Sequence, residues 1–171
     1  QVAAGFLSTQ LGVRAAPVRE DTLAARVAQR TREHLALTLL AVLASALLGV
    51  PLGVLCARSA RLRSVTLGVA GVVQTVPSLA LLVLLLPLFG IGAKPAVAAL
   101  VLYGLFPVLE GTVTGLRGVP PPLRESAEAL GLSPFARLWH LDLPMASPSI
   151  LSGLRTSAVL CVGTATLGAM V

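Results

Sequence analysis

The chain has 171 residues, of which 56% are hydrophobic and 12% are charged, and its formal net charge is +6. A soluble domain of this size needs far more charge on its surface, so the composition indicates an integral membrane protein. The positive charge does not indicate nucleic-acid binding, because the arginines are spread over polar connections and no basic stripe is interleaved with aromatic side chains. The two cysteines, Cys56 and Cys161, lie far apart and have neither metal nor redox spacing.

The first residues are more polar than the rest of the chain. Residues 1–18 have no basic region followed by an apolar core, so we expect no signal peptide there. Residues 19–34 are rich in charge, and Leu23 and Val27 stand at i,i+4 spacing, which is typical of a short helix at the membrane surface. We therefore predict an extracytoplasmic, interfacial segment over residues 1–34.

Four apolar segments follow, and each is long enough, at about 1.5 Å per residue, to cross a hydrocarbon core of about 30 Å. They cover residues 35–57, 65–89, 96–116 and 145–171. The expected fold is an all-α, polytopic membrane helix bundle with about four spans. Gly49 with Gly53, and Gly111 with Gly115, form two pairs of small residues that allow another helix to approach closely.

Polar side chains interrupt the second apolar segment. Gln74, Thr75 and Ser78 flank Pro77, which deprives a carbonyl group of its helical partner. The polar side chains either satisfy the freed carbonyl or line a water-filled path. A simple kink at the proline is an equally good explanation.

The third and fourth apolar segments each carry an ionisable residue, Glu110 and Arg155. Such a group is costly inside a membrane and is a candidate for function. From the helical rise, the two residues lie about 10 Å and 16 Å from the same membrane surface, so an ion pair between them is expected. Alternatively, Glu110 lines the transport path.

A polar segment, residues 119–144, separates the last two apolar segments and predicts two short helices around a turn. Prolines 120–122 suit the start of the first helix, and Gly131 suits a C-terminal cap with positive φ. Ser133 then caps a second helix that begins with Pro134. Arg124 and Glu128 have the i,i+4 spacing of an ion pair. The second helix has an expected apolar face of Phe135, Leu138 and Leu141.

The spacing within the polar segment resembles the "EAA loop" of permease subunits of binding-protein-dependent ABC importers. The residues that carry the resemblance are Glu125, Ser126, Ala127, Gly131, Leu141, Leu143 and Pro144, with Ser126 and Leu141 as mild departures. Residues 74–82, 88–92 and 150–166 further resemble the osmoprotectant branch of these permeases, which serves glycine betaine, choline and carnitine. That branch usually has Arg-Asn where this chain has Glu110 and Gly111.

The resemblance implies a type I ABC importer permease domain over residues 35–171, C-terminally incomplete. In such proteins the loop docks on a cytoplasmic ATP-binding subunit through residues that correspond to Glu125, Ala127, Gly131, Leu141, Leu143 and Pro144. Further implied partners are an extracytoplasmic substrate-binding protein, a second permease copy or a paralogue, and the lipid bilayer of the bacterial inner membrane. The implied path residues are Gln74, Thr75, Ser78 and Glu110.

No catalytic or metal-binding constellation and no phosphate-binding loop is present in the sequence, so we expect no enzyme activity, metal or cofactor. The energy for transport would come from the ATP-binding partner. A different class of function remains open, a membrane assembly or scaffold subunit that associates through the Gly49/Gly53 and Gly111/Gly115 faces and transports nothing.

Overall fold

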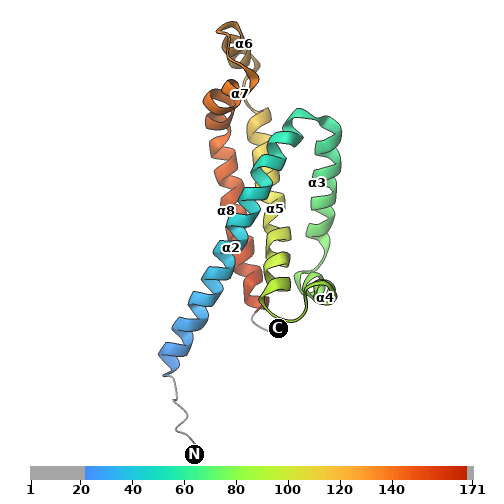
Figure 1. Ribbon diagram of the computed structural model, residues 1–171, viewed down its shortest axis with the longest axis vertical. Helices are drawn as coiled ribbons and strands as arrows, with labels where there is room; N and C mark the ends of the chain where they lie inside the picture. The colour runs from blue at the N-terminus through green and yellow to red at the C-terminus, as the bar shows by residue number, and fades with distance from the viewer. Residues whose placement is uncertain (1–21, 169–171) are drawn as a thin grey trace, which may run out of the picture. The chain divides into compact units, whose positions relative to one another are not determined.

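The computed structural model describes residues 22–168, and all regular structure in this range is helical, which confirms the all-α fold (Figure 1). The chain divides into two units, residues 1–32 and 33–171. The helices are α2 (Leu23–Arg58), α3 (Ala60–Thr75), α4 (Ser78–Phe89), α5 (Ala93–Arg117), α6 (Pro121–Ala129), α7 (Pro134–Arg137), the π-helical turn η1 (Leu138–Asp142) and α8 (Leu143–Gly168).

Three stretches of helix are long and apolar enough to cross a membrane, and they lie in α2, in α5, and in α7 to α8. A fourth crossing is possible if α3 and α4 together count as one bent span. Both numbers agree with the expected bundle of about four spans. A short interfacial helix was expected over residues 19–34, within the predicted extracytoplasmic segment 1–34. Residues 23–34 are the first turns of α2 and form no separate helix, and residues 1–21 lie outside the described residues.

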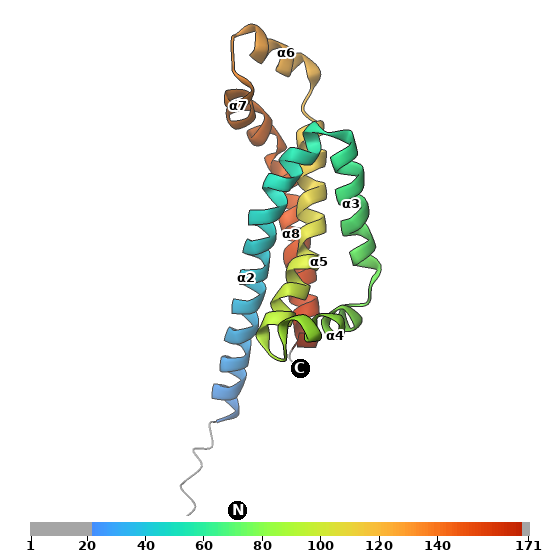
Figure 2. The same ribbon diagram turned by 45° about the vertical axis from the view of Figure 1, so that its right-hand side comes forward.

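The second predicted span, residues 65–89, is not one straight helix. It breaks between α3 and α4, whose axes differ by 105°. The break falls at Val76 and Pro77, where Val76 has the extended backbone (φ −73°, ψ 127°) that a following proline favours. Figure 2 shows α4 at one end of the bundle, whereas α6 and α7 lie at the opposite end.

Glycines allow α5 to pack closely on α8. A Cβ atom on Gly111 would lie 2.6 Å from the carbonyl oxygen of Ser149, and one on Gly115 would lie 2.8 Å from that of Ala146. Any side chain at these positions would therefore collide with the backbone of α8. The expectation of a close helix contact at this pair is confirmed, and the contact lies within this chain.

The other glycine pair faces α5 from α2. A Cβ atom on Gly49 would lie 2.9 Å from Val108 Cγ1, and one on Gly53 would lie 2.6 Å from Thr112 Cβ. Both glycines are buried. Because the chain's own helices occupy both glycine faces, neither is available for association with a separate subunit.

Candidate functional site

The polar segment folds as two capped helices, as its residue pattern predicts. Gly131 has φ +79°, a backbone conformation that is easy only for glycine. The amide of Gly131 donates to the carbonyl of Glu128 (2.9 Å), and the amide of Leu132 donates to the carbonyl of Ala127 (3.1 Å). This is the Schellman arrangement that satisfies the last carbonyl groups of α6. Ser133 caps α7 through the amide of Ala136 (3.2 Å).

The charged side chains of the segment do not pair as expected. The predicted pair of Arg124 with Glu128 is wrong, because Arg124 instead contacts Asp142 (Nε to Oδ1, 3.1 Å). Glu128 forms its ion pair with Arg137. Among these charged residues Asp142 is buried, at 6% exposure, whereas Glu128 is exposed. A buried carboxylate needs cationic partners much more than an exposed one does, because water cannot solvate it. Asp142 was not among the predicted site residues.

Asp142 also has a second arginine beside it. Nε of Arg137 lies 3.5 Å from Oδ2 of Asp142, without the alignment of a hydrogen bond. A cavity of about 270 Å³ adjoins this cluster, and Arg58, at the end of α2, lines it together with Arg124, Arg137 and Asp142. The polar segment is thus attached to the bundle through charged groups around a partly open space.

The outer surface of the polar segment is apolar in part. Phe135 (70% exposed) and Trp139 (57% exposed) contact each other edge to face, with ring centroids 6.3 Å apart, and Leu130 is 80% exposed. Of the three residues expected to form the apolar face of the second helix, Phe135 is exposed, whereas Leu138 and Leu141 are partly buried. The π-helical turn, Leu138–Asp142, follows Phe135 and widens the helix between Leu138 and Leu141.

The polar-segment residues that the family resemblance assigns to ATPase docking differ in their exposure. Glu125, Gly131 and Pro144 are exposed, Leu141 and Leu143 are partly buried, and Ala127 is buried. Sequence reasoning missed Leu130 and Trp139 as surface candidates. The available signal was the presence of large apolar side chains in an otherwise polar connection.

The three polar residues at the α3/α4 break have different environments. The side-chain amide of Gln74 donates to the main-chain carbonyl of Tyr103 (2.6 Å). Thr75 is exposed, and its hydroxyl donates to Val72 of its own helix (2.7 Å). Ser78 is partly buried. The Tyr103 hydroxyl donates to the carbonyl of Val76, so α5 contacts the break itself.

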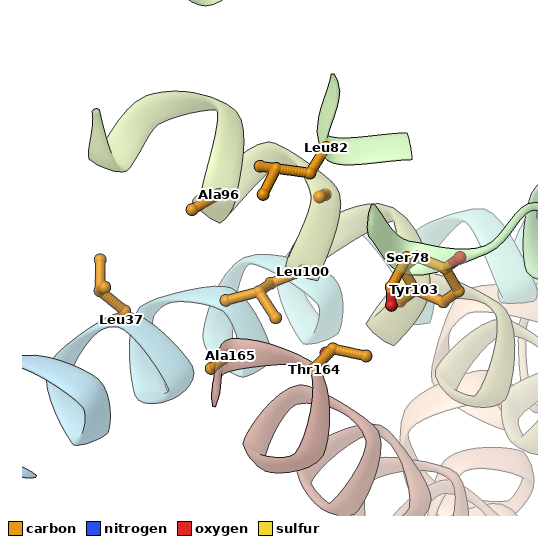
Figure 3. Close-up of a pocket in the computed structure, with 9 residues that line it drawn as sticks. Leu37, Ser78, Leu82, Ala96, Leu100, Tyr103, Thr164 and Ala165 are labelled. Atoms are coloured by element: carbon orange, nitrogen blue, oxygen red, sulfur yellow. The ribbon is translucent and has the colours of Figure 1, made fainter. Parts of the chain in front are cut away.

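Ser78 and Tyr103 line a small pocket between α2, α4, α5 and α8, together with Thr164 and apolar side chains such as Leu37 (Figure 3). Its volume of about 30 Å³ corresponds to about one water molecule. In this conformation the pocket is too small for an organic solute.

Glu110 and Arg155 do not meet. Both side chains are exposed, and no ion pair joins them within residues 22–168. The reason is the rotation of α8, in which Gly153 packs against Pro107 of α5. Arg155 follows two residues later, about 200° around the helix, and therefore lies on the side of α8 away from α5. The predicted ion pair is wrong.

Membrane-length helices joined by a folded, charged polar segment define a polytopic membrane protein with a structured extramembrane element. Residues 49–171 match the family described as the binding-protein-dependent transport system inner membrane component. The chain belongs to this family, as the spacing within the polar segment predicted.

Curated relatives of the chain are named as permeases. It is 39% identical over 142 residues to the choline transport system permease protein OpuBB of Bacillus subtilis, and 38% identical over 142 residues to the glycine betaine/carnitine/choline transport system permease protein OpuCB of the same organism. Each alignment covers 83% of this chain but 65% of the relative. It is also 41% identical over 150 residues to the osmoprotectant import permease protein OsmW of Salmonella typhimurium, covering 85% of this chain and 70% of that protein.

Proposed function

We propose that the chain is the membrane-spanning subunit of an ABC importer in the bacterial inner membrane and forms the translocation path for a quaternary ammonium osmoprotectant. A separate ATP-binding subunit supplies the energy, and an extracytoplasmic binding protein delivers the substrate. A second permease copy or a paralogue completes the path. Residues 35–171 form the permease domain, and the polar segment is the coupling loop.

The exposed aromatic pair of the polar segment is the single observation that most supports docking of the ATPase. Phe135 in α7 and Trp139 in η1 are exposed at the beginning of the stretch that continues into α8, and α6 and α7 project from one end of the bundle (Figure 1). Exposed aromatic side chains next to charged ones are typical of a protein interface. Glu125 lies exposed in the same segment. Because ATP is cytoplasmic, this end of the bundle faces the cytoplasm.

The names of the relatives, which refer to choline, glycine betaine, carnitine and osmoprotectants, support the proposed substrate class. The proposed path passes the α3/α4 break, since interrupted helices in membranes occur where protein or a water-filled path covers the backbone. Thr75 and Ser78 present hydroxyl groups there, and Glu110 presents an exposed carboxylate on α5. Gln74 lies at the same break, where its side-chain amide donates to the Tyr103 carbonyl of α5.

Co-purification tests the docking part of the proposal. The protein is produced with its cognate ATPase, and Phe135 and Trp139 are both changed to alanine. Loss of two central aromatic contacts of about 2 kcal/mol each weakens ATPase retention at least tenfold, while membrane insertion is unchanged. Leu88→Ala is the matched control, because Leu88 is 75% exposed but lies on α4 at the opposite end of the bundle. Retention of the ATPase at the level of the unchanged protein would exclude this surface.

Uptake into proteoliposomes tests the transport part. The complete transporter, with ATP inside and binding protein outside, is expected to accumulate labelled choline or glycine betaine. If an assembled complex shows neither ATP-dependent uptake nor ATPase retention, the scaffold alternative is favoured. The structure weakens that alternative, because the glycine faces it relied on are already filled by α2, α5 and α8.

A further inference from the structure

Asp142 occupies the junction of the polar segment with the spans. It is the last residue of η1 and directly precedes α8. Its carboxylate contacts Arg124 from α6 through Oδ1 (3.1 Å) and Arg137 from α7 through Oδ2 (3.5 Å). With its side chain 9% exposed, it is largely removed from water, whereas Glu128 in the same cluster is 61% exposed.

Arg124 connects the same cluster to α5. It donates a hydrogen bond to the main-chain carbonyl of Leu116, in the last turn of α5. The last carbonyl groups of a helix have no amide partner within it, and Pro120, four residues after Leu116, has no amide hydrogen to offer. Arg124 therefore replaces the missing donor, and one guanidinium group links the end of α5 to the carboxylate at the start of α8.

A buried carboxylate strongly favours the arrangement in which its cationic partners are present, because losing one leaves an uncompensated charge. The two contacts of Asp142 are unequal, since only the one to Arg124 has hydrogen-bond geometry. The adjoining cavity of about 270 Å³ leaves room for these side chains to move. Arg58, which also lines this cavity, has no ion-pair partner among residues 22–168.

We propose that Asp142 is a positioning residue for energy coupling: through Arg124 it transmits movement of α6 and α7 to both α5 and α8. Asp142 does not contact the ATPase in this scheme. A displacement of α6 moves the Arg124 guanidinium, which pulls on the Leu116 carbonyl and on the carboxylate before α8. This inference rests on the proposed docking of an ATPase on the polar segment.

The test compares Asp142→Asn with the unchanged protein in the complete, reconstituted transporter. Asparagine keeps the shape but removes the charge. We expect the ATPase to remain bound and ATP hydrolysis to continue, while the amount of substrate transported per ATP falls at least fivefold. Glu128→Gln is the matched control, because it removes an exposed carboxylate from the same cluster, and its transport-to-ATP ratio should stay within twofold of the unchanged protein.

A double variant distinguishes transmission from simple loss of structure. If Asp142 acts through Arg124, then Arg124→Gln with Asp142→Asn lowers the transport-to-ATP ratio no further than Asp142→Asn alone. Where Asp142→Asn fails to insert, Arg124→Gln is measured instead and should show the same uncoupled hydrolysis. An unchanged ratio, or a parallel loss of ATPase binding and transport, would overturn the proposal. Failure of the unchanged protein to bind any ATPase would contradict the proposed function instead.

Discussion

Gln74 of α3 donates a hydrogen bond of 2.6 Å from its side-chain amide to the main-chain carbonyl of Tyr103 in α5. Pro107 stands four residues after Tyr103 and has no amide hydrogen, so this carbonyl has no partner in its own helix. The Tyr103 hydroxyl in turn donates to the carbonyl of Val76, next to the α3/α4 break. The end of α3 thus supplies a donor to the α5 carbonyl that Pro107 leaves unpaired, and α5 supplies a donor to the Val76 carbonyl at the α3/α4 break.

Gln74→Leu should destabilise the bundle. The substitution leaves the Tyr103 carbonyl without a donor, which costs about 1–3 kcal/mol in a buried setting. Thermal unfolding in detergent measures the effect. Thr75→Val is the control, because Thr75 is exposed and bonds only to its own helix, and its loss should stay below about 0.5 kcal/mol. Equal losses for the two variants would show that the contact with α5 contributes nothing.

Tyr103→Phe removes only the hydroxyl that reaches Val76 and keeps the ring in its apolar surroundings. We expect a loss of about 1–2 kcal/mol. Because the Gln74 and Tyr103 bonds join the same two elements, the double variant with Gln74→Leu should lose less than the sum of the single losses. Chemical denaturation in mixed micelles gives all three values, and strict additivity would mean that the two bonds act independently.

Gly131→Ala tests the cap between α6 and α7. A Cβ atom there would meet no other atom within 4 Å, so the cost of about 1–2 kcal/mol comes only from the positive φ. Hydrogen exchange of the amides of Gly131 and Leu132 should accelerate, and ATPase retention should fall. Gly163→Ala is the control, since Gly163 is equally open but helical with ordinary φ.

Gly131→Pro should abolish coupling while the spans remain inserted, and unchanged transport by that variant would remove the coupling assignment.

Gly111→Ala tests the contact between α5 and α8. Its Cβ atom would lie 2.6 Å from the backbone oxygen of Ser149, so the helices must separate, at a cost of about 1–3 kcal/mol or more. Gly68→Ala, in α3, introduces the same methyl group into open space and should be neutral or slightly stabilising. The two melting temperatures in detergent make the comparison. A Gly111→Ala protein as stable as the Gly68→Ala protein would disprove the close approach.

Substrate selectivity should reside in the separate binding protein. Tight recognition of a quaternary ammonium uses several aromatic faces around the cation. In the spans Tyr103 is buried and bonded to Val76, Phe89 lies at the end of α4, and Phe106 faces Gly71 of α3. Titration of the purified permease alone with choline or glycine betaine should therefore detect no submillimolar binding. A tight, stoichiometric isotherm would refute this view.

Local features of the polar segment were predictable from the sequence. The caps at Gly131 and Ser133 form as predicted because their hydrogen bonds join residues at most five positions apart. The membrane class was equally predictable, because long apolar segments have only the bilayer to cover them. The family was predicted through a resemblance, because the identities of Glu125, Gly131 and Pro144 and the distances between them are read directly along the chain.

The contacts between distant residues depended on the tertiary structure. Arg124 has an acidic residue at i,i+4 but contacts Asp142, 18 residues away, because that carboxylate is buried and Glu128 is not. Glu110 and Arg155 lie at plausible depths, yet the rotation of α8 on α5 separates them. Residue patterns give the depth of a side chain and its place on a helix, whereas helix packing sets the rotation of one helix against its neighbour and thereby determines which polar groups come within hydrogen-bonding distance.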